Sequence, residues 1–180
     1  LGPSPKAIEA IAEEAKQGNL YPMIPTMRAK KAISEYVHKP LEDIITYAGS
    51  GAGINAIGEA FLNPGDEVLI CSPTYMAYGH LPARHGAKLV EVFSKDGVST
   101  DLELLAGAIT DKTKLIFICN PNNPTGTILD PARLDEFVEK LPEHVICVVD
   151  EAYIDWVDIP NYPSALKYVE EGGKNIIVLR

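Results

Sequence analysis

The chain has 180 residues, of which 46% are hydrophobic and 23% charged, so it is an ordinary globular chain that can bury one sizeable core. Its formal net charge of -9 argues against nucleic acid and anionic membrane surfaces as partners, because both would be repelled. No apolar run approaches the ~20 residues that span a bilayer, and no signal-peptide pattern is present, so we expect a cytoplasmic protein.

Residues 1–40 predict a helical segment. Ser4 is a suitable N-cap and Pro5 a suitable first residue for a helix whose apolar residues share one face. After a loop over residues 20–25, a second amphipathic helix is expected from about Thr26 to His38.

Beyond residue 40 the pattern changes to an alternation of short strands and helices. Such an alternation predicts an α/β fold, with a mostly parallel sheet and helices on both of its faces. Strands are expected at residues 44–47, 67–71, 88–93, 115–119, 145–149 and 175–179. Helices are expected at residues 54–62, 101–109, 130–140 and 164–170, together with one that starts near Tyr75 and reaches His85.

The three cysteines lie in or at the end of these apolar, strand-like runs, as Cys71, Cys119 and Cys147. In such runs cysteine behaves as a small buried hydrophobe, and this spacing matches no metal site. We therefore expect structural cysteines and no bound metal.

Two of the expected strands have polar residues at their carboxyl ends. The apolar runs at 115–119 and 145–149 show no alternation, which is typical of parallel strands buried on both faces. The first is followed by the rigid run Asn120–Gly126 and the second by Asp150. Open α/β sheets bind ligands at this edge, so Asp150 could meet a cationic group of a bound cofactor. The alternative is a helix-capping or solvated acid.

A glycine-rich turn, Ala48-Gly49-Ser50-Gly51-Ala52-Gly53, precedes the helix expected at 54–62. A helix N-terminus that follows such a turn offers unpaired N–H groups and the positive end of the helix dipole to an anion. Phosphate is the obvious candidate. The alternative is a tight turn that binds no ligand.

Four motifs follow one another along the chain: Gly49-Ser50-Gly51, Pro73-Thr74-Tyr75, Asn120-Pro121-Asn122-Asn123-Pro124-Thr125-Gly126 and Asp150-Glu151-Ala152-Tyr153. In this order and rough spacing the chain resembles the class I and II aminotransferases that depend on pyridoxal phosphate, over essentially its whole length. It looks closest to the histidinol-phosphate aminotransferase group. The resemblance implies the large domain of the fold-type-I pyridoxal-phosphate-dependent transferases.

The resemblance also implies a role for each side chain around the cofactor ring. Asp150 would pair with the pyridine nitrogen and keep it protonated, so that the ring can draw off electrons from the substrate's α-carbon. Asn123 and Tyr153 would hydrogen-bond the 3-oxygen of the ring, and Tyr75 would stack on its face. The peptide bond between Asn123 and Pro124 is expected to be cis.

The phosphate of the cofactor would be held by Ser50 together with the backbone N–H groups of Gly51 and Ala52. Tyr21 would reach the phosphate of the cofactor in the neighbouring subunit, so the resemblance implies a homodimer. Many histidinol-phosphate enzymes read Ser-Asp-Glu at the positions of Ser50-Gly51-Ala52, a difference that leaves a backbone-built phosphate loop intact. Taken singly, the tyrosines could be packing residues and Asn123 a turn former.

The family's imine-forming lysine would lie just beyond the strand expected at 175–179, whereas this sequence ends at Arg180. Lys174 precedes that strand, so we expect the catalytic lysine after Arg180. On this interpretation residues 1–40 are an N-terminal helical segment with a dimer-contacting loop, and residues 41–180 are a partial cofactor-binding large domain. We expect no transaminase activity from these residues alone.

The resemblance implies a cytoplasmic, homodimeric aminotransferase of histidine biosynthesis, which transfers an amino group between glutamate and a keto acceptor. Within the same fold, the alternative is an aminotransferase or a decarboxylase of another amino acid. From a different class, a non-catalytic phosphate- or nucleotide-binding α/β domain would use residues 49–53 for a phosphate and have no use for Asp150.

Overall fold

The structure is a computed structural model that describes residues 2–21, 23–171 and 174–180. The chain forms two compact units, Leu1–Thr46 and Tyr47–Arg180. Among the described residues, no helix is both long enough and apolar enough to cross a membrane.

The first unit is helical. It contains helix α1 (Pro5–Ala15), helix α2 (Met23–Val37) and the short 3-10 helix η1 (Leu41–Asp43). Ser4 caps α1 as predicted, since its side chain accepts a hydrogen bond from the Ala7 N–H at 3.2 Å. The Arg28 guanidinium of α2 contacts the Glu14 carboxylate of α1 at 2.6 Å, an exposed ion pair that joins the two helices.

Helix α2 begins at Met23 rather than at Thr26, which corrects the loop expected over residues 20–25. Pro25 therefore lies in the first turn of the helix. Proline is tolerated in the first turn of a helix, because the N–H groups of that turn have no intrahelical partner. Pro22, within the expected loop, lies outside the described residues.

The strand expected at residues 44–47 is not formed. Ile44 has an extended backbone, with φ -112° and ψ 129°, but no ladder partner for this segment exists among the described strands. Ile45 is 74% exposed and Tyr47 51% exposed. An apolar, β-branched run predicts the backbone conformation of a strand, whereas a strand also requires a neighbour with which to pair.

The second unit contains one sheet of five parallel strands in the order β2-β1-β3-β4-β5, which confirms the expected α/β fold. The strands are β1 (Glu67–Ser72), β2 (Lys88–Phe93), β3 (Thr113–Cys119), β4 (Ile146–Asp150) and β5 (Ile176–Leu179). All residues of β4 are buried, as the unbroken apolar run predicts. In the register of the sheet, Asp150 lies beside Cys119 of β3 on one side and Leu179 of β5 on the other.

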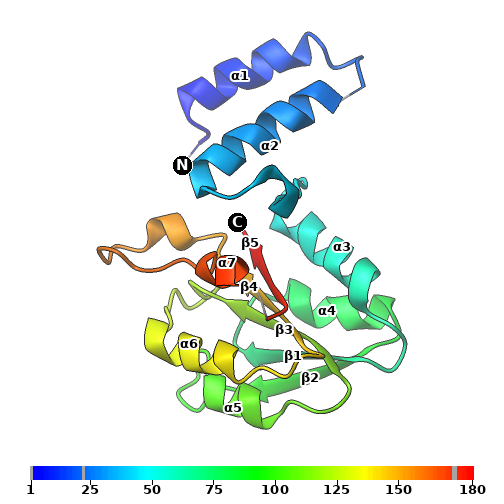
Figure 1. Cartoon of the computed structure of the whole chain (residues 1–180), viewed down its shortest axis with the longest axis vertical. Helices are drawn as coiled ribbons and strands as arrows, with labels where there is room; N and C mark the ends of the chain where they lie inside the picture. Colours follow the sequence, from blue (N-terminus) through cyan, green and yellow to red (C-terminus); the bar gives the residue numbers. More distant parts are fainter. Residues whose placement is uncertain (1, 22, 172–173) are drawn as a thin grey trace. The chain divides into compact units, whose positions relative to one another are not determined.

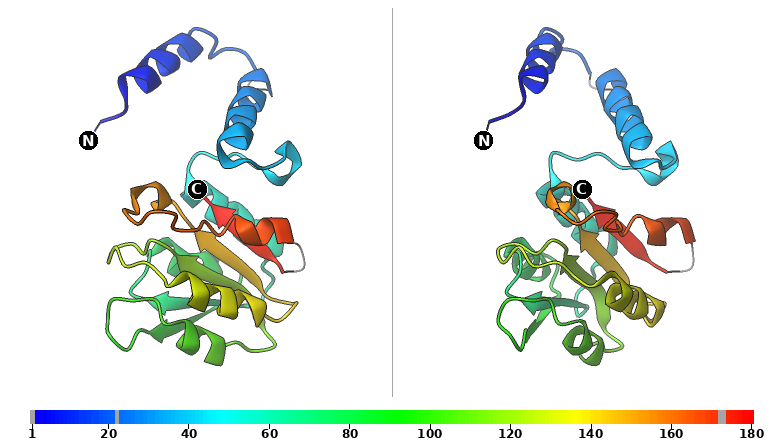
Figure 2. Two further views of the ribbon diagram at one scale, coloured as in Figure 1. Left: turned by 60° about the vertical axis from the view of Figure 1, so that its left-hand side comes forward. Right: turned by 90° about the vertical axis from the view of Figure 1, so that its left-hand side faces the viewer.

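Helices cover both faces of this sheet (Figure 1). One face packs against α3 (Ser50–Phe61) and α4 (Ala77–Arg84), through a core that includes Ile54, Ile57 and Leu81. The other face packs against α5 (Leu102–Gly107), α6 (Pro131–Glu139) and α7 (Lys167–Glu171). The turned views in Figure 2 show the same separation into three layers. A 3-10 helix, η2 (Ile154–Trp156), follows β4.

Helices α3 and α4 meet at Gly58, which is buried. A Cβ atom at this position would lie 2.6 Å from Cδ1 of Leu81 and 2.9 Å from Nε2 of His85. We expect Gly58→Ala to lower the free energy of unfolding by about 1–2 kcal/mol, since overpacking outweighs the gain in helix propensity. Urea unfolding measures this change. Gly107→Ala is the matched control, because a Cβ atom at Gly107 meets nothing within 4 Å, and equal shifts of both midpoints would contradict the prediction.

Candidate functional site

Asp150 ends the buried strand β4 with only 3% of its surface exposed. Its Oδ2 atom accepts a hydrogen bond from the Tyr78 hydroxyl at 2.7 Å, and its Oδ1 atom accepts one from the Ala152 N–H at 3.1 Å. The alternative of a solvated acid is therefore excluded. A carboxylate oxygen has more than one acceptor position, so both oxygens retain capacity for a donor brought by a ligand.

Tyr78 is a site residue that the sequence did not reveal. It lies in the first turn of α4, is fully buried, and stacks on Phe117 with the ring centroids 4.7 Å apart. Its ring also meets Tyr75 edge-on, at 5.5 Å and 86°. Burial and the charge of Asp150 raise the pKa of Tyr78, so its hydroxyl stays protonated and donates. The sequence shows a second tyrosine three residues after Tyr75, but only the fold reveals that Tyr78 contacts Asp150.

The loop that follows β3 is fastened to the loop that follows β1 by Asn122, which is 3% exposed. Its Nδ2 atom donates to the Pro73 carbonyl at 2.9 Å and to the Thr125 hydroxyl at 2.8 Å. Its Oδ1 atom accepts a hydrogen bond from the Thr74 hydroxyl at 3.0 Å. The segment that carries Tyr75 and the segment that carries Asn123 are therefore held together at one edge of the sheet.

The peptide bond between Asn123 and Pro124 is cis, as predicted. Two further X-Pro bonds at this edge, Ser72-Pro73 and Asn120-Pro121, are cis as well.

A cavity of about 510 Å³ lies between the loop that follows β3 and the segment that follows β4. Asn123 and Tyr153 both line it, together with Trp156 and Ile159. Its volume is typical of small-molecule sites. Ser50, Tyr75 and Asp150 are not among its lining residues.

The glycine-rich turn leads into the N-terminus of α3. Gly49 has a φ of 85°, a conformation that favours glycine, and added Cβ atoms at Gly49 and Gly51 would meet nothing within 4 Å. The first N–H groups of a helix have no intrahelical partner, so Ser50 and Gly51 offer donors at an open helix end, whereas the Ala52 N–H already donates to the Gly49 carbonyl at 3.1 Å. One turn further on, a Cβ atom at Gly53 would lie 3.2 Å from the side chain of Leu179.

Contacts between neighbours relate this helix end to Asp150. Leu179, against which Gly53 packs, is the register partner of Asp150 in the sheet. Asp150 is bonded to Tyr78, and Tyr78 contacts Tyr75. The helix end, the carboxylate and the aromatic ring therefore share the carboxyl edge of the sheet.

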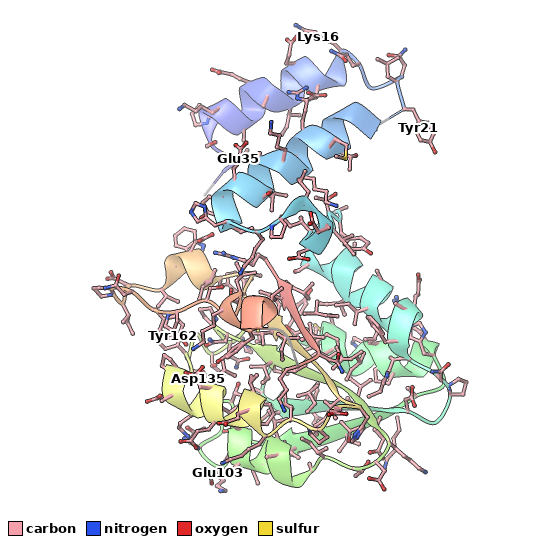
Figure 3. The ribbon with its side chains drawn as sticks, viewed as in Figure 1. Lys16, Tyr21, Glu35, Glu103, Asp135 and Tyr162 are labelled. Carbon is pink, nitrogen blue, oxygen red and sulfur yellow. The ribbon has the colours of Figure 1, made fainter. Side chains whose placement is uncertain are left out.

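Tyr21 belongs to the first unit, where it is 86% exposed at the turn between α1 and α2 (Figure 3). Its expected contact with the cofactor of a neighbouring subunit stays a prediction.

The groups at this edge of the sheet fit the chemistry of pyridoxal phosphate. The helix end suits a phosphate, the buried carboxylate suits a protonated ring nitrogen, and the aromatic ring suits a planar heterocycle. The side chains of Asn123, an amide, and Tyr153, a phenol, line the neighbouring cavity of about 510 Å³. Within the described ranges, no three His, Cys, Asp or Glu side chains gather to hold a metal ion.

Known proteins resemble the chain along its whole length. The sequence profile of the family described as "Aminotransferase class I and II" matches residues 1–180. A histidinol-phosphate aminotransferase from Akkermansia muciniphila is 41% identical over 180 residues, which are 100% of this chain and 49% of that protein. An aromatic amino acid aminotransferase from Thermobifida fusca is 37% identical over 180 residues, which are 100% of this chain and 50% of that protein.

A solved structure shares the fold. The crystal structure of histidinol-phosphate aminotransferase from Sinorhizobium meliloti in complex with pyridoxal-5'-phosphate matches with a TM-score of 0.79 and 28% identity, over 86% of this chain and 42% of that one. The chain thus spans about half the length of the curated relatives that it matches. Because the family profile covers every residue and the fold agrees, the chain belongs to the class I and II aminotransferase family.

Proposed function

We propose that this chain forms the cofactor-binding part of a pyridoxal-phosphate-dependent aminotransferase, which moves an amino group between glutamate and an imidazole-bearing keto phosphate. The observation that carries the proposal is Asp150, a buried carboxylate that two donors orient at the ligand-binding edge of a parallel sheet. The relative named histidinol-phosphate aminotransferase supports the choice of substrate. A homodimer in which Tyr21 reaches the neighbouring cofactor belongs to the same proposal, as does a cytoplasmic location.

Each residue has a task toward the cofactor. Bound pyridoxal phosphate supplies an electron sink for the charge left when a substrate's α-proton departs. Asp150 holds the ring nitrogen in its protonated form, and Tyr75 supports the face of the ring. Asn123 and Tyr153 orient the 3-oxygen.

The phosphate is held at the N-terminus of α3. Ser50 would donate its hydroxyl and Gly51 its backbone N–H, and the positive end of the helix dipole reinforces both. The Ala52 N–H, which donates to the Gly49 carbonyl, would share its hydrogen with the phosphate. These contacts fix the position of the ring relative to Asp150.

Ligand binding tests the proposal directly. The chain is titrated with pyridoxal phosphate and with pyridoxal, while the near-ultraviolet and visible absorption of the ligand is followed. Binding of ATP, which does not absorb in that range, is followed by titration calorimetry. We expect saturable binding of pyridoxal phosphate, weaker binding of pyridoxal and no displacement by ATP. Binding of ATP without binding of pyridoxal phosphate would instead establish the nucleotide-binding alternative.

The substrate is tested on the same complex. Histidinol phosphate is expected to change the absorption of the cofactor-loaded chain at lower concentration than phenylalanine does. The opposite order would favour an aminotransferase of aromatic amino acids, the activity in the name of another relative.

A further inference from the structure

We propose that Tyr78 is a positioning residue, which fixes the orientation and the charge of Asp150 and thereby keeps the proton on the ring nitrogen of bound pyridoxal phosphate. This inference rests on the proposed function, because it presupposes that Asp150 faces the ring nitrogen. It assigns a role to a buried tyrosine that belongs to none of the cofactor-contacting positions described above.

The first step of the argument is the hydrogen bond itself. The Tyr78 hydroxyl lies 2.7 Å from Oδ2 of Asp150, the usual distance for an O–H donor and an oxygen acceptor. Ala152 occupies the other oxygen from the backbone. With one donor on each oxygen, the carboxylate cannot rotate without losing both contacts, so its free acceptor positions keep a fixed direction.

The second step is electrostatic. A carboxylate with 3% exposure has lost most of its hydration, and such burial favours its protonated, neutral form. A phenol that donates to the ionised form opposes this tendency, and hydrogen bonds to charged groups are about twice as strong as neutral ones. When a ring nitrogen and Asp150 compete for one proton, the Tyr78 hydroxyl therefore moves the proton toward the nitrogen.

The third step concerns the other titratable groups that face this pair. Cys119 lies beside Asp150 in the register of the sheet, and burial raises the pKa of its thiol, so it is neutral at physiological pH. Its Sγ atom donates to the Pro121 carbonyl. In the described part of the chain the Asp150 carboxylate accepts hydrogen bonds from Tyr78 and Ala152 and from no Lys or Arg, so the phenol of Tyr78 is its side-chain donor.

The fourth step is rigidity. Tyr78 is 0% exposed, and its ring is stacked on Phe117 with an interplanar angle of 13°. The same ring meets the edge of Tyr75, whose proposed task is to support the cofactor's face. One side chain therefore fixes both the charge partner of the ring and its stacking partner.

The test compares Tyr78→Phe with Tyr162→Phe. Tyr162, labelled in Figure 3, also donates its hydroxyl at 2.7 Å, but to the Leu129 carbonyl. Each variant is loaded with pyridoxal phosphate labelled with ¹⁵N at the ring nitrogen, and the ¹⁵N chemical shift is measured. In Tyr78→Phe we expect the proton-sharing equilibrium to move about tenfold toward the carboxylate, seen as a shift toward the value of an unprotonated ring. Tyr162→Phe is expected to keep the wild-type shift.

A double-mutant cycle reports on the contact without cofactor. Tyr78→Phe and Asp150→Ala should be coupled in the unfolding equilibrium by about tenfold, whereas Tyr162→Phe and Asp150→Ala should be additive. If Tyr78→Phe does not fold, 3,5-difluorotyrosine at position 78 replaces it. This more acidic donor keeps the shape of the ring and should move the ¹⁵N shift in the opposite direction, toward a protonated ring.

The outcomes separate the two proposals. Wild-type chain that binds no pyridoxal phosphate overturns the proposed function, and the role of Tyr78 with it. Wild-type chain that binds the cofactor, with an unchanged ¹⁵N shift in Tyr78→Phe or in the difluorotyrosine form, overturns the role of Tyr78 alone. A changed shift together with coupling in the cycle supports it.

Discussion

Asp150→Asn is expected to weaken the binding of pyridoxal phosphate about 100-fold, because removing one partner of a buried, hydrogen-bonded charge pair costs about 2–5 kcal/mol. The fold should survive. Asparagine has nearly the same shape, its oxygen can still accept from the Ala152 N–H, and the hydroxyl of Tyr78 can accept as well as donate. The substitution therefore removes the charge while it keeps the packing.

Equilibrium titration of the cofactor, followed by absorption, measures this loss. Asp111→Asn is the control, since Asp111 is an exposed residue in the turn before β3. This variant should bind the cofactor as tightly as the wild type does. Equal affinities of the Asp150 variant and the wild type would show that the ring nitrogen is not held by this carboxylate.

Glu151→Ala is expected to lower the free energy of unfolding by about 3 kcal/mol, since it leaves buried donors without acceptors. Glu151 is 1% exposed, although it follows the site carboxylate directly. Its oxygens accept from the Ala165 N–H and from the Ser164 hydroxyl, both at 2.6 Å, and the Arg180 guanidinium lies 4.0 Å away. This carboxylate therefore fastens the segment before α7 to the end of β4.

Urea unfolding of Glu151→Ala beside Glu139→Ala provides the measurement, because Glu139 is an exposed residue at the end of α6. Loss of less than about 1 kcal/mol in the Glu151 variant would mean that the segment finds other acceptors.

Glu151→Gln tests how the contribution of Glu151 to stability depends on pH. Burial raises the pKa of Glu151 above its ordinary value of 4.5, more than the donors from Ser164 and Ala165 lower it. The folded protein then holds the proton more tightly than the unfolded chain does. The stability that this proton contributes is present below pH 4.5 and is lost as the pH rises through the raised pKa. The wild type should lose stability relative to Glu151→Gln over that interval, and parallel pH profiles would contradict the assignment.

The central strands could be predicted because an unbroken apolar run must be buried on both faces, and in an α/β fold the central parallel strands are buried in this way. The strand predicted at 88–93 matches β2 over its full length, and the run at 145–149 overlaps β4. The segment at 44–47 shows the limit of this reasoning, since its composition says nothing about whether a neighbouring strand is available. Local sequence describes conformation, whereas pairing is decided by the rest of the chain.

The site was predictable only in part for the same reason. Asp150 stood out because a charge directly follows an apolar strand, a contrast that is visible in the sequence alone. Tyr78 lies 72 positions earlier and looks like any aromatic residue of an amphipathic helix. Asn122 was not singled out in the sequence, because its buried bonds to Pro73 and Thr74 depend on how two loops meet. Groups that act through a partner distant in sequence leave no local signal.

Asn122 also limits how this site can change over evolution. Its amide uses two donors and one acceptor in three directions, which aspartate cannot reproduce because it lacks the donors. Glutamine carries the same groups one methylene further out. Any replacement would disturb two loops at once, so selection for a new substrate has little freedom here. Trp156 and Ile159 line the cavity and are 73% and 49% exposed, so their side chains can change without disturbing the two loops. Substitutions that alter substrate specificity should therefore accumulate at such exposed cavity positions.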